Sequence, residues 1–489
     1  MNKALKLIFL IILIFLLSLY LLLENLIQNE SFSLLMILLN LLGLVLFNLR
    51  LEPQKNINNQ YIRIITIFII GYVIVFFQLH VDYFLGNFSE DNIRFWVNPR
   101  IVPKSLILSS IGFYSVILGY VYQIKKFNAT TKNHYKYSSP IIGYSILSFF
   151  FLLLMILTIN PLYLLGGYGN FEMGNTARYS SILFELSYIA GIIQALINNS
   201  NLTGEKKSIY VFCKSIGFLH LSLFIIYSLI ILISGDRGPI IYLIVGISSA
   251  YIVSTKWKIS KIKIFVLFFC ASTLISGMVV LRNSTDDNTP AFYKLYYALV
   301  DGESKAFSSM EDSNSISKST FELALSIRTL HNSINNVPNE RSYFYGQLQF
   351  LQIITVIPLG QKFIKDYFNI NDSELTSAKY VTDIVGGVGG SEGTNCITDL
   401  YLDFGVIGVF LGMFFFGRIV RSIEENTFRE KLPKAIILVS YIVICQYAIY
   451  IPRATIMFNF RNIIWVFLII KFIQLISPKK HIKHNETNY

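Results

Sequence analysis

Long apolar runs recur along the whole chain and constrain its fold more than any other feature of the sequence. Each run is about 16–22 residues long, the length that an α-helix needs to cross the hydrocarbon core of a bilayer. We expect about twelve spans by this criterion. They lie near residues 4–23, 32–47, 62–79, 101–124, 140–158, 180–197, 215–233, 239–255, 262–281, 397–417, 434–451 and 456–476. The sequence therefore predicts an all-α fold, a polytopic bundle of membrane helices.

The overall composition excludes an ordinary soluble protein. A soluble chain of 489 residues would form two or three domains with charged surfaces. Here 54% of the residues are hydrophobic and only 14% are charged. The first run resembles a signal peptide, but it has no small-residue cleavage site and continues directly into Glu24. We therefore expect an uncleaved membrane anchor.

The net charge of +12 has a distribution that matters more than its size. Lysine and arginine gather in loops that follow even-numbered spans, and in the C-terminal tail. The basic loops lie at residues 125–136, 206–214, 256–263 and 418–434. This alternation is the positive-inside rule, which predicts a multi-pass protein of the cytoplasmic membrane with both termini in the cytoplasm. The bilayer is then the partner of this chain, and we expect no nucleic-acid partner.

One loop is much longer than the others and divides the chain into three regions. We expect about nine spans in 1–281, a large extracytoplasmic loop in 282–396, and about three spans with a basic cytoplasmic tail in 397–489. Within the loop, apolar residues recur at helical spacing in 321–334 and 345–357. We expect these amphipathic helices to pack on the membrane domain or to enter the interface.

Two groups of glycines lead into and through the tenth span. Gly386–Gly393 superficially matches a dinucleotide fingerprint, but no strand precedes it, so we interpret it as a hinge. Gly405, Gly408 and Gly412 share roughly one face of the span at 397–417. That face predicts close packing against another helix.

Four arginines fall at the expected outer face, where the positive-inside rule should deplete them. They are Arg178, Arg237, Arg282 and Arg453. A guanidinium group matches phosphate oxygens bidentately and keeps its charge. Arginines that converge from separate helix ends would form an anion site suited to pyrophosphate. The alternative, which we favour for Arg178, is that the side chain reaches to lipid headgroups.

The tightest of the outer turns is Ser234–Pro239, between two apolar runs. Gly235 and Gly238 allow a sharp reversal of the backbone, and proline is favourable at the start of the following helix. Asp236 either orients the adjacent Arg237 or neutralises it. A charge at this boundary is costly, and such charges are commonly functional.

Three residues are candidates for a general base that accepts a proton from a sugar hydroxyl. Glu392 and Asp399 are carboxylates near the outer surface, and His331 has a reference pKa near neutrality. The alternative is that the carboxylates are solvated loop residues and that the histidine is incidental. Tyrosines near the outer face, such as Tyr401, are candidates for stacking on sugars or for an interfacial aromatic belt. The four cysteines form no metal-binding motif, and we expect neither a metal nor a cofactor.

Taken together, these elements resemble the Wzy family of O-antigen and capsular-polysaccharide polymerases. The matching pieces are Ser234–Pro239, the stretch from Tyr345 to Pro358, the approach to Asp399–Gly405, and Arg453 in the last outer turn. The resemblance covers roughly the C-terminal half of the chain. It implies an architecture like that of the GT-C-like polymerases and ligases.

The resemblance also implies an activity. Such an enzyme joins undecaprenyl-pyrophosphate-linked oligosaccharide repeat units at the outer face of the bacterial cytoplasmic membrane, without a metal, and works with a flippase and a chain-length regulator. Arg237, Arg282 and Arg453 would stabilise the pyrophosphate. Two rival functions stay open: an O-antigen ligase shares the donor chemistry, and a lipid-linked oligosaccharide flippase has a similar number of spans.

Overall fold

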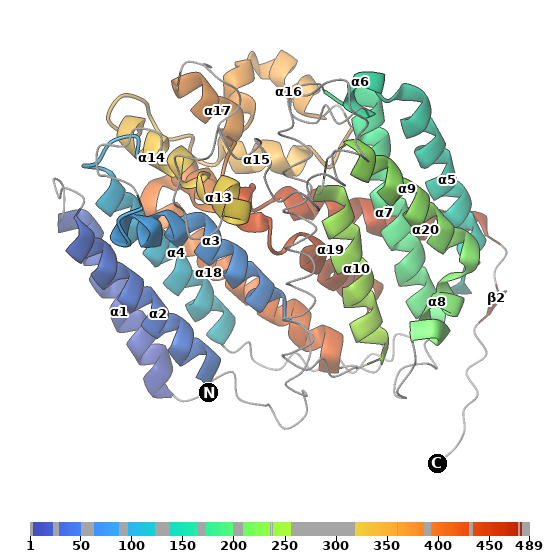
Figure 1. Cartoon of the computed structure of the whole chain (residues 1–489), viewed down its shortest axis with the longest axis horizontal. Coiled ribbons are helices and arrows are strands. Elements are labelled where there is room, and N and C mark those ends of the chain that lie inside the picture. The colour runs from blue at the N-terminus through green and yellow to red at the C-terminus, as the bar shows by residue number, and fades with distance from the viewer. Residues whose placement is uncertain are drawn as a thin grey trace, which may run out of the picture.

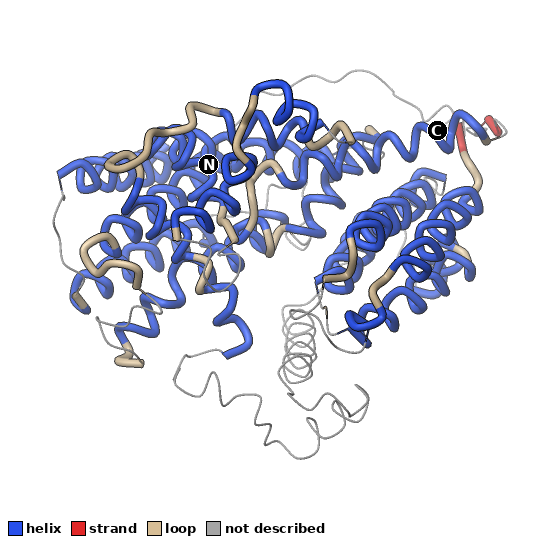
Figure 2. Tube along the Cα trace, turned by 90° about the horizontal axis from the view of Figure 1, so that it is seen from above, coloured by secondary structure: helices blue, strands red, loops and turns tan. Residues whose placement is uncertain are grey.

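The computed structural model describes most of the chain and is helical almost throughout. The described residues are 3–22, 29–49, 63–87, 96–122, 137–164, 172–198, 209–234, 236, 238–255, 318–358, 360–385, 393–429, 434–477 and 480–481. Within them, β1 (Tyr137–Ser138) and β2 (Lys480–His481) form a two-residue antiparallel pair at one edge of the molecule (Figure 2). The predicted all-α fold is confirmed.

Apolar helices occupy the expected spans throughout the described residues. Eight are long and apolar enough to cross a bilayer. They are α1 (Lys3–Leu22), α2 (Glu30–Leu49), α3 (Ile64–Phe84), α4 (Val102–Val121), α5 (Ile141–Thr158), α7 (Asn175–Asn198), α18 (Cys396–Arg429) and α20 (Phe458–Ile476). A further pair, α8 (Ile209–Ile216) and α9 (Phe218–Ser234), is bent by 94°. Two shorter apolar helices are α10 (Gly238–Thr255) and α19 (Ala435–Tyr447). The span expected at 262–281 lies outside the described residues, so the total of twelve stays a prediction.

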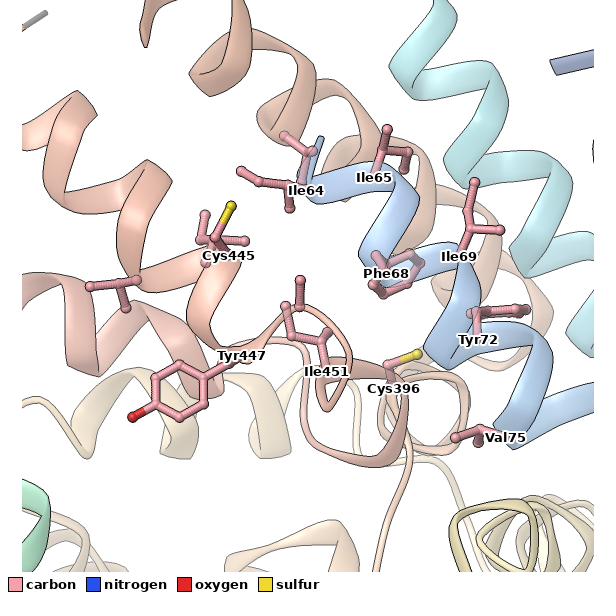
Figure 3. Packing of buried hydrophobic residues seen from close by; sticks show 14 of the residues in the cluster. Ile64, Ile65, Phe68, Ile69, Tyr72, Val75, Cys396, Cys445, Tyr447 and Ile451 are labelled. Carbon is pink, nitrogen blue, oxygen red and sulfur yellow. The ribbon is translucent and has the colours of Figure 1, made fainter. Parts of the chain in front are cut away.

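The spans differ in how much of their surface is buried by other helices. In the most apolar stretch, 89% of α4 and 83% of α7 is buried, against 28% of α1, α5 and α20. In Figure 3, Phe68 and Tyr72 of α3 lie beside Cys396 of α18 and Ile451. Helices α3, α4 and α7 therefore form the interior, and the apolar outer surfaces of α1, α5 and α20 face lipid.

Helices α4 and α18 pack closely along their length (Figure 1). A Cβ at Gly119 would lie 2.0 Å from the carbonyl oxygen of Phe414, and a Cβ at Gly417 would lie 2.1 Å from that of Val116. Only glycine permits this approach, which is how membrane helices gain packing energy without a hydrophobic driving force.

Helix α18 is broken within its first third. Phe404 and Gly405 leave the helical conformation, and Gly405 has φ +61. The prediction that Gly405, Gly408 and Gly412 pack against another helix is wrong. A Cβ at Gly408 would lie 2.4 Å from the carbonyl oxygen of Leu400, and one at Gly412 would lie 2.5 Å from the Leu400 side chain. Gly408 and Gly412 instead receive the displaced first segment of the same helix, and Gly405 faces Tyr343.

At its other end, α18 continues to Arg429, well past the expected end of the span at residue 417. The buried carboxylate of Glu424 accepts hydrogen bonds from the Tyr120 hydroxyl and, at 3.2 Å, from the Ile65 backbone N–H. The charged end of α18 is thereby fixed to the end of α4 and the beginning of α3. Lys6 and Arg418 both lie over the ring of Tyr122, which places the beginning of α1 on the same side. This is the side that the positive-inside rule predicts to be cytoplasmic.

Residues 318–385 form a second helical layer, the cap segment, across the opposite end of the bundle. It comprises α13 (Lys318–Ala324), α14 (Ile327–Asn336), α15 (Gln347–Ile354), α16 (Gly360–Phe368), η3 (Asp372–Leu375) and α17 (Ser377–Ile384). Figure 1 shows it at the top of the view, with the beginning of α1 at the bottom. Helices therefore lie at both stretches predicted to be amphipathic, and they pack on α3, α4, α18 and α20.

Candidate functional site

A buried carboxylate lies where three membrane helices meet near one end of the bundle. Glu185 of α7 is only 5% exposed. It accepts hydrogen bonds from the hydroxyl of Tyr227 in α9 at 3.0 Å and from that of Tyr447 in α19 at 3.3 Å. An ionisable group held this deep among apolar helices is costly, and such groups commonly mark functional sites.

Asp236 lies in the turn between α9 and α10, near Glu185. One carboxylate oxygen accepts a hydrogen bond from the hydroxyl of Tyr163, in the short helix α6 (Pro161–Leu164), at 3.2 Å. The other accepts one from the backbone N–H of Gly238 at 3.1 Å, so Asp236 caps the first turn of α10. Asp236 is partly exposed and close enough to Glu185 for the two carboxylates to interact electrostatically.

A tyrosine wall connects this turn to the connection between α19 and α20. The ring of Tyr242 lies 4.7 Å from that of Tyr447 and 5.6 Å from that of Tyr450, measured between centroids. Tyr450 precedes η4 (Ile451–Arg453), which carries the predicted Arg453. The backbone N–H of Arg453 donates to the Tyr450 carbonyl at 2.9 Å, and its side chain is partly exposed. Arg453 therefore lies three residues after Tyr450 of this wall.

Two further arginines meet at the same end of the bundle. Arg461 lies in the first turn of α20 and is partly buried, and Arg178 lies exposed in the first turn of α7. Arg461 is close enough to interact electrostatically with Arg178 and with the hydroxyl of Tyr447. We call Arg178, Glu185, Asp236, Tyr447 and Arg461 the end cluster. Two guanidinium groups brought together in this way favour an anion between them.

Asp399, a candidate base, lies in α18 and bonds two helices of the cap segment. It is fully buried and accepts hydrogen bonds from Gln349 Nε2 of α15 at 2.6 Å and from Ser377 Oγ of α17 at 2.8 Å. The backbone N–H of Ile456, in the connection between η4 and α20, also donates to it. Asp399 thus joins α18, the cap segment and the connection that carries Arg453.

Asp403 lies one turn further along α18, and its carboxylate binds the backbone of the cap segment. Its carboxylate accepts hydrogen bonds from the N–H groups of Gly346 at 3.2 Å, Leu348 at 3.1 Å and Gln349 at 3.0 Å. These are N–H groups at the beginning of α15, which have no acceptor within their own helix. Asp403 therefore caps α15 from a helix more than fifty residues away in sequence.

Two other candidates lie in the interior. Tyr401 is 2% exposed and donates its hydroxyl to the Val337 carbonyl at 2.8 Å, which holds the cap segment. His331 is fully buried, with its ring 5.7 Å from that of Trp96. Burial, assisted by neighbouring His80 and Arg328, lowers the pKa of His331 well below its usual value. The neutral ring of His331 packs against an aromatic side chain.

The structure places some predicted site residues together and leaves others undescribed. Asp236, Gly238 and Arg178 lie at the same end of the bundle as Glu185, and Arg453 follows the tyrosine wall. Gly235, Arg237, Arg282 and Glu392 lie outside the described residues. Arg237 stands between Asp236 and Gly238, so its two chain neighbours are at the end cluster. Over the described ranges, no three His, Cys, Asp or Glu side chains gather as a metal site would require.

Sequence reasoning missed Tyr447 and the two charged members of the end cluster that lie inside spans, Glu185 and Arg461. Both fall within expected spans, 180–197 and 456–476, and were counted there only as part of an apolar run. A charged residue inside such a run is itself a signal of function, because burying it without a role would be unfavourable.

Comparison with known proteins bears on the whole chain. A family model described as O-antigen polysaccharide polymerase Wzy matches residues 5–485. No curated protein and no solved structure matches the chain. The family match includes the end cluster, the cap segment and the N-terminal spans that carried no recognisable motif.

Proposed function

Because this chain belongs to the Wzy family of O-antigen polysaccharide polymerases, we propose that it joins undecaprenyl-pyrophosphate-linked oligosaccharide repeat units into O-antigen or capsule. The family and the apolar helices make it a multi-pass protein of the bacterial inner membrane. We place the reaction at the outer face and both termini in the cytoplasm, as the positive-inside rule favours.

In the proposed reaction, a sugar hydroxyl of the incoming repeat unit attacks the anomeric carbon of the growing chain. A new glycosidic C–O bond forms, and the bond between the anomeric carbon and the pyrophosphate oxygen breaks. Undecaprenyl pyrophosphate leaves with the electron pair, and the hydroxyl proton passes to a base. We propose that this transfer needs no metal, because arginines stabilise the developing charge.

The end cluster is the observation that carries this proposal. Arg461 interacts electrostatically with Tyr447, the hydrogen-bond partner of Glu185, and with Arg178, which adds a second positive charge. Arg237 belongs to the turn that Asp236 opens, and Arg453 follows Tyr450. We assign the pyrophosphate to these arginines, with Arg282 as a further contributor. Lipid tails would then lie against the apolar sides of the neighbouring spans.

The proton acceptor is best assigned to a carboxylate that a sugar can reach. Asp236 is partly exposed, whereas Glu185 is buried and holds two tyrosine hydroxyls. We therefore propose Asp236 as the base and Glu185 as a positioning residue, with Glu392 as the second candidate base. Asp399 and Tyr401 fix the cap segment, and buried His331 supports its packing.

Gene deletion followed by gel analysis of the surface polysaccharide tests the proposed function. Loss of a polymerase leaves single repeat units in place of a ladder. Loss of a ligase leaves complete polymer on its lipid carrier, and loss of a flippase leaves repeat units on the cytoplasmic side. Either of the last two results would contradict the assignment as a polymerase.

A further inference from the structure

Helix α16 bonds the protein through two polar side chains and exposes aromatic side chains outward. On the polar side, Gln361 Nε2 donates to the Leu351 carbonyl at 3.3 Å, and Lys365 pairs with Asp372 of η3 at 2.7 Å. Gln361 and Lys365 are four residues apart and so share one side of the helix. Both side chains therefore bond other parts of the cap segment, α15 and η3.

The opposite side of α16 carries the exposed Phe363 and Tyr367, beside Lys362 and Asp366, and Phe368 is exposed at the end of the helix. Phe363 is 70% exposed, Tyr367 is 73% exposed and Phe368 is 61% exposed. The rings of Phe363 and Tyr367 stack on each other, with centroids 6.3 Å apart. The outward side of α16 therefore exposes two stacked aromatic rings between charged residues, a pattern that suits a boundary between polar and apolar surroundings.

The exposed apolar surface continues onto α15, which packs beside α16. Phe350 is 55% exposed, Ile353 is 42% exposed and Ile357 is 62% exposed. We call Phe350, Ile353, Ile357, Phe363, Tyr367 and Phe368 the apolar ledge. A cluster of exposed aromatic and aliphatic side chains of this kind marks an interaction surface.

The end of α15 is anchored to a membrane-spanning helix. The indole N–H of Trp465 in α20 donates to the Val356 carbonyl at 2.9 Å. Trp465 lies seven residues after the first residue of α20, about 10 Å along its axis. In Figure 1, α16 lies at about the height of α6, which follows the end of α5. The apolar ledge is therefore continuous with the lipid-facing surface of the spans.

We propose that the apolar ledge inserts into the boundary between headgroups and acyl chains, in the leaflet on the side of the cap segment. The bilayer fits this surface better than a protein partner does, because the ledge borders α20, whose apolar outer surface already faces lipid. Amphipathic helices that lie in a membrane interface bury one apolar face in this way. The ledge then fixes the cap segment against the membrane surface, whatever reaction the end cluster performs.

Site-specific fluorescence of the full-length protein in lipid nanodiscs tests this proposal. In a background in which the native cysteines are replaced, Phe363→Cys and Tyr367→Cys are each labelled with an environment-sensitive probe. Glu340→Cys, at an exposed position of the cap segment outside the apolar ledge, is the control. We expect the emission at positions 363 and 367 to shift to shorter wavelength in nanodiscs. Lipids with a spin label near the headgroup should quench it several-fold more strongly than at 340.

Equal quenching at positions 363, 367 and 340 would overturn the proposal. So would quenching that is absent at 363 and 367 although the labelled protein elutes as a single folded species, because the ledge would then belong to a protein partner. Two labelled positions on the apolar side guard against a local effect of either substitution. None of these readouts depends on polymerase activity.

Discussion

The hydroxyl of Tyr447 donates a hydrogen bond to the buried carboxylate of Glu185 at 3.3 Å, which joins α19 to α7 directly beside Arg461. Because Tyr227 donates to the other carboxylate oxygen, the position of Glu185 in the end cluster is fixed from two helices. We expect Glu185 to affect the reaction by positioning the tyrosines, without touching the substrate.

We predict that Glu185→Gln lowers polymer synthesis per molecule of enzyme by more than about tenfold, which corresponds to about 1.4 kcal/mol of activation free energy. The amide keeps the shape of the side chain but replaces one of the two oxygens that accept from Tyr227 and Tyr447 with an NH2 group. The measurement is the length distribution and amount of polymer, normalised to protein level by immunoblot, at several values of pH.

Glu424→Gln is the matched control, because Glu424 is also a buried carboxylate that accepts from a tyrosine, but at the opposite end of the bundle. We expect it to lower the protein level and to leave the polymer per molecule unchanged. Equal losses per molecule in the two variants would mean that Glu185 has only a structural role.

Asp403→Ala should loosen the cap segment without unfolding the spans. The substitution leaves three N–H groups at the beginning of α15 without their acceptor, and the loss of such a cap costs about 1–2 kcal/mol. Limited proteolysis in detergent should cut between α14 and α16 several-fold faster than in the wild type. Asp383→Ala removes only an exposed ion pair with Arg341, so its cleavage rate should match that of the wild type. Identical rates for the two variants would contradict the capping role.

Stability should fall with acidification because of His331. Its pKa in the folded protein is lowered by burial, whereas in the unfolded chain it has the ordinary value of about 6.5. Below that pH the unfolded state binds a proton that the folded state refuses, so the free energy of unfolding decreases by up to about 1.4 kcal/mol per pH unit. Thermal unfolding is measured at a series of pH values. The melting temperature should fall less on acidification for His331→Asn than for the wild type. Parallel curves for the variant and the wild type would contradict this.

Hydropathy located the apolar helices that the structure describes, because the thickness of the bilayer fixes the length of a spanning helix. It did not show that α18 breaks at Phe404 and Gly405 or that it continues to Arg429. Both features depend on contacts with residues far away in sequence. Gly405 faces Tyr343 of the cap segment, and Glu424 is held by α3 and α4.

The site was predicted in part for a similar reason. Topology placed Arg178, Asp236 and Arg453 at one end of the bundle, but a list of outer residues does not show which of them are accessible. Asp399 and Tyr401 fall in one of the stretches on which the family resemblance was based, yet their hydrogen bonds are made to the cap segment. Glu185 was overlooked because a single charge hardly changes the hydropathy of a span.

Polymer analysis of an Arg461→Ala variant tests the central claim most directly. Cells that lack the native gene are complemented with the wild type, with Arg461→Ala, or with Lys471→Ala, which removes an exposed cation from the same helix. Gel analysis should show a full ladder for the wild type and for Lys471→Ala, and only single repeat units for Arg461→Ala at equal protein level. A ladder of wild-type length and intensity from Arg461→Ala would contradict the assignment of the end cluster as the site of polymerisation.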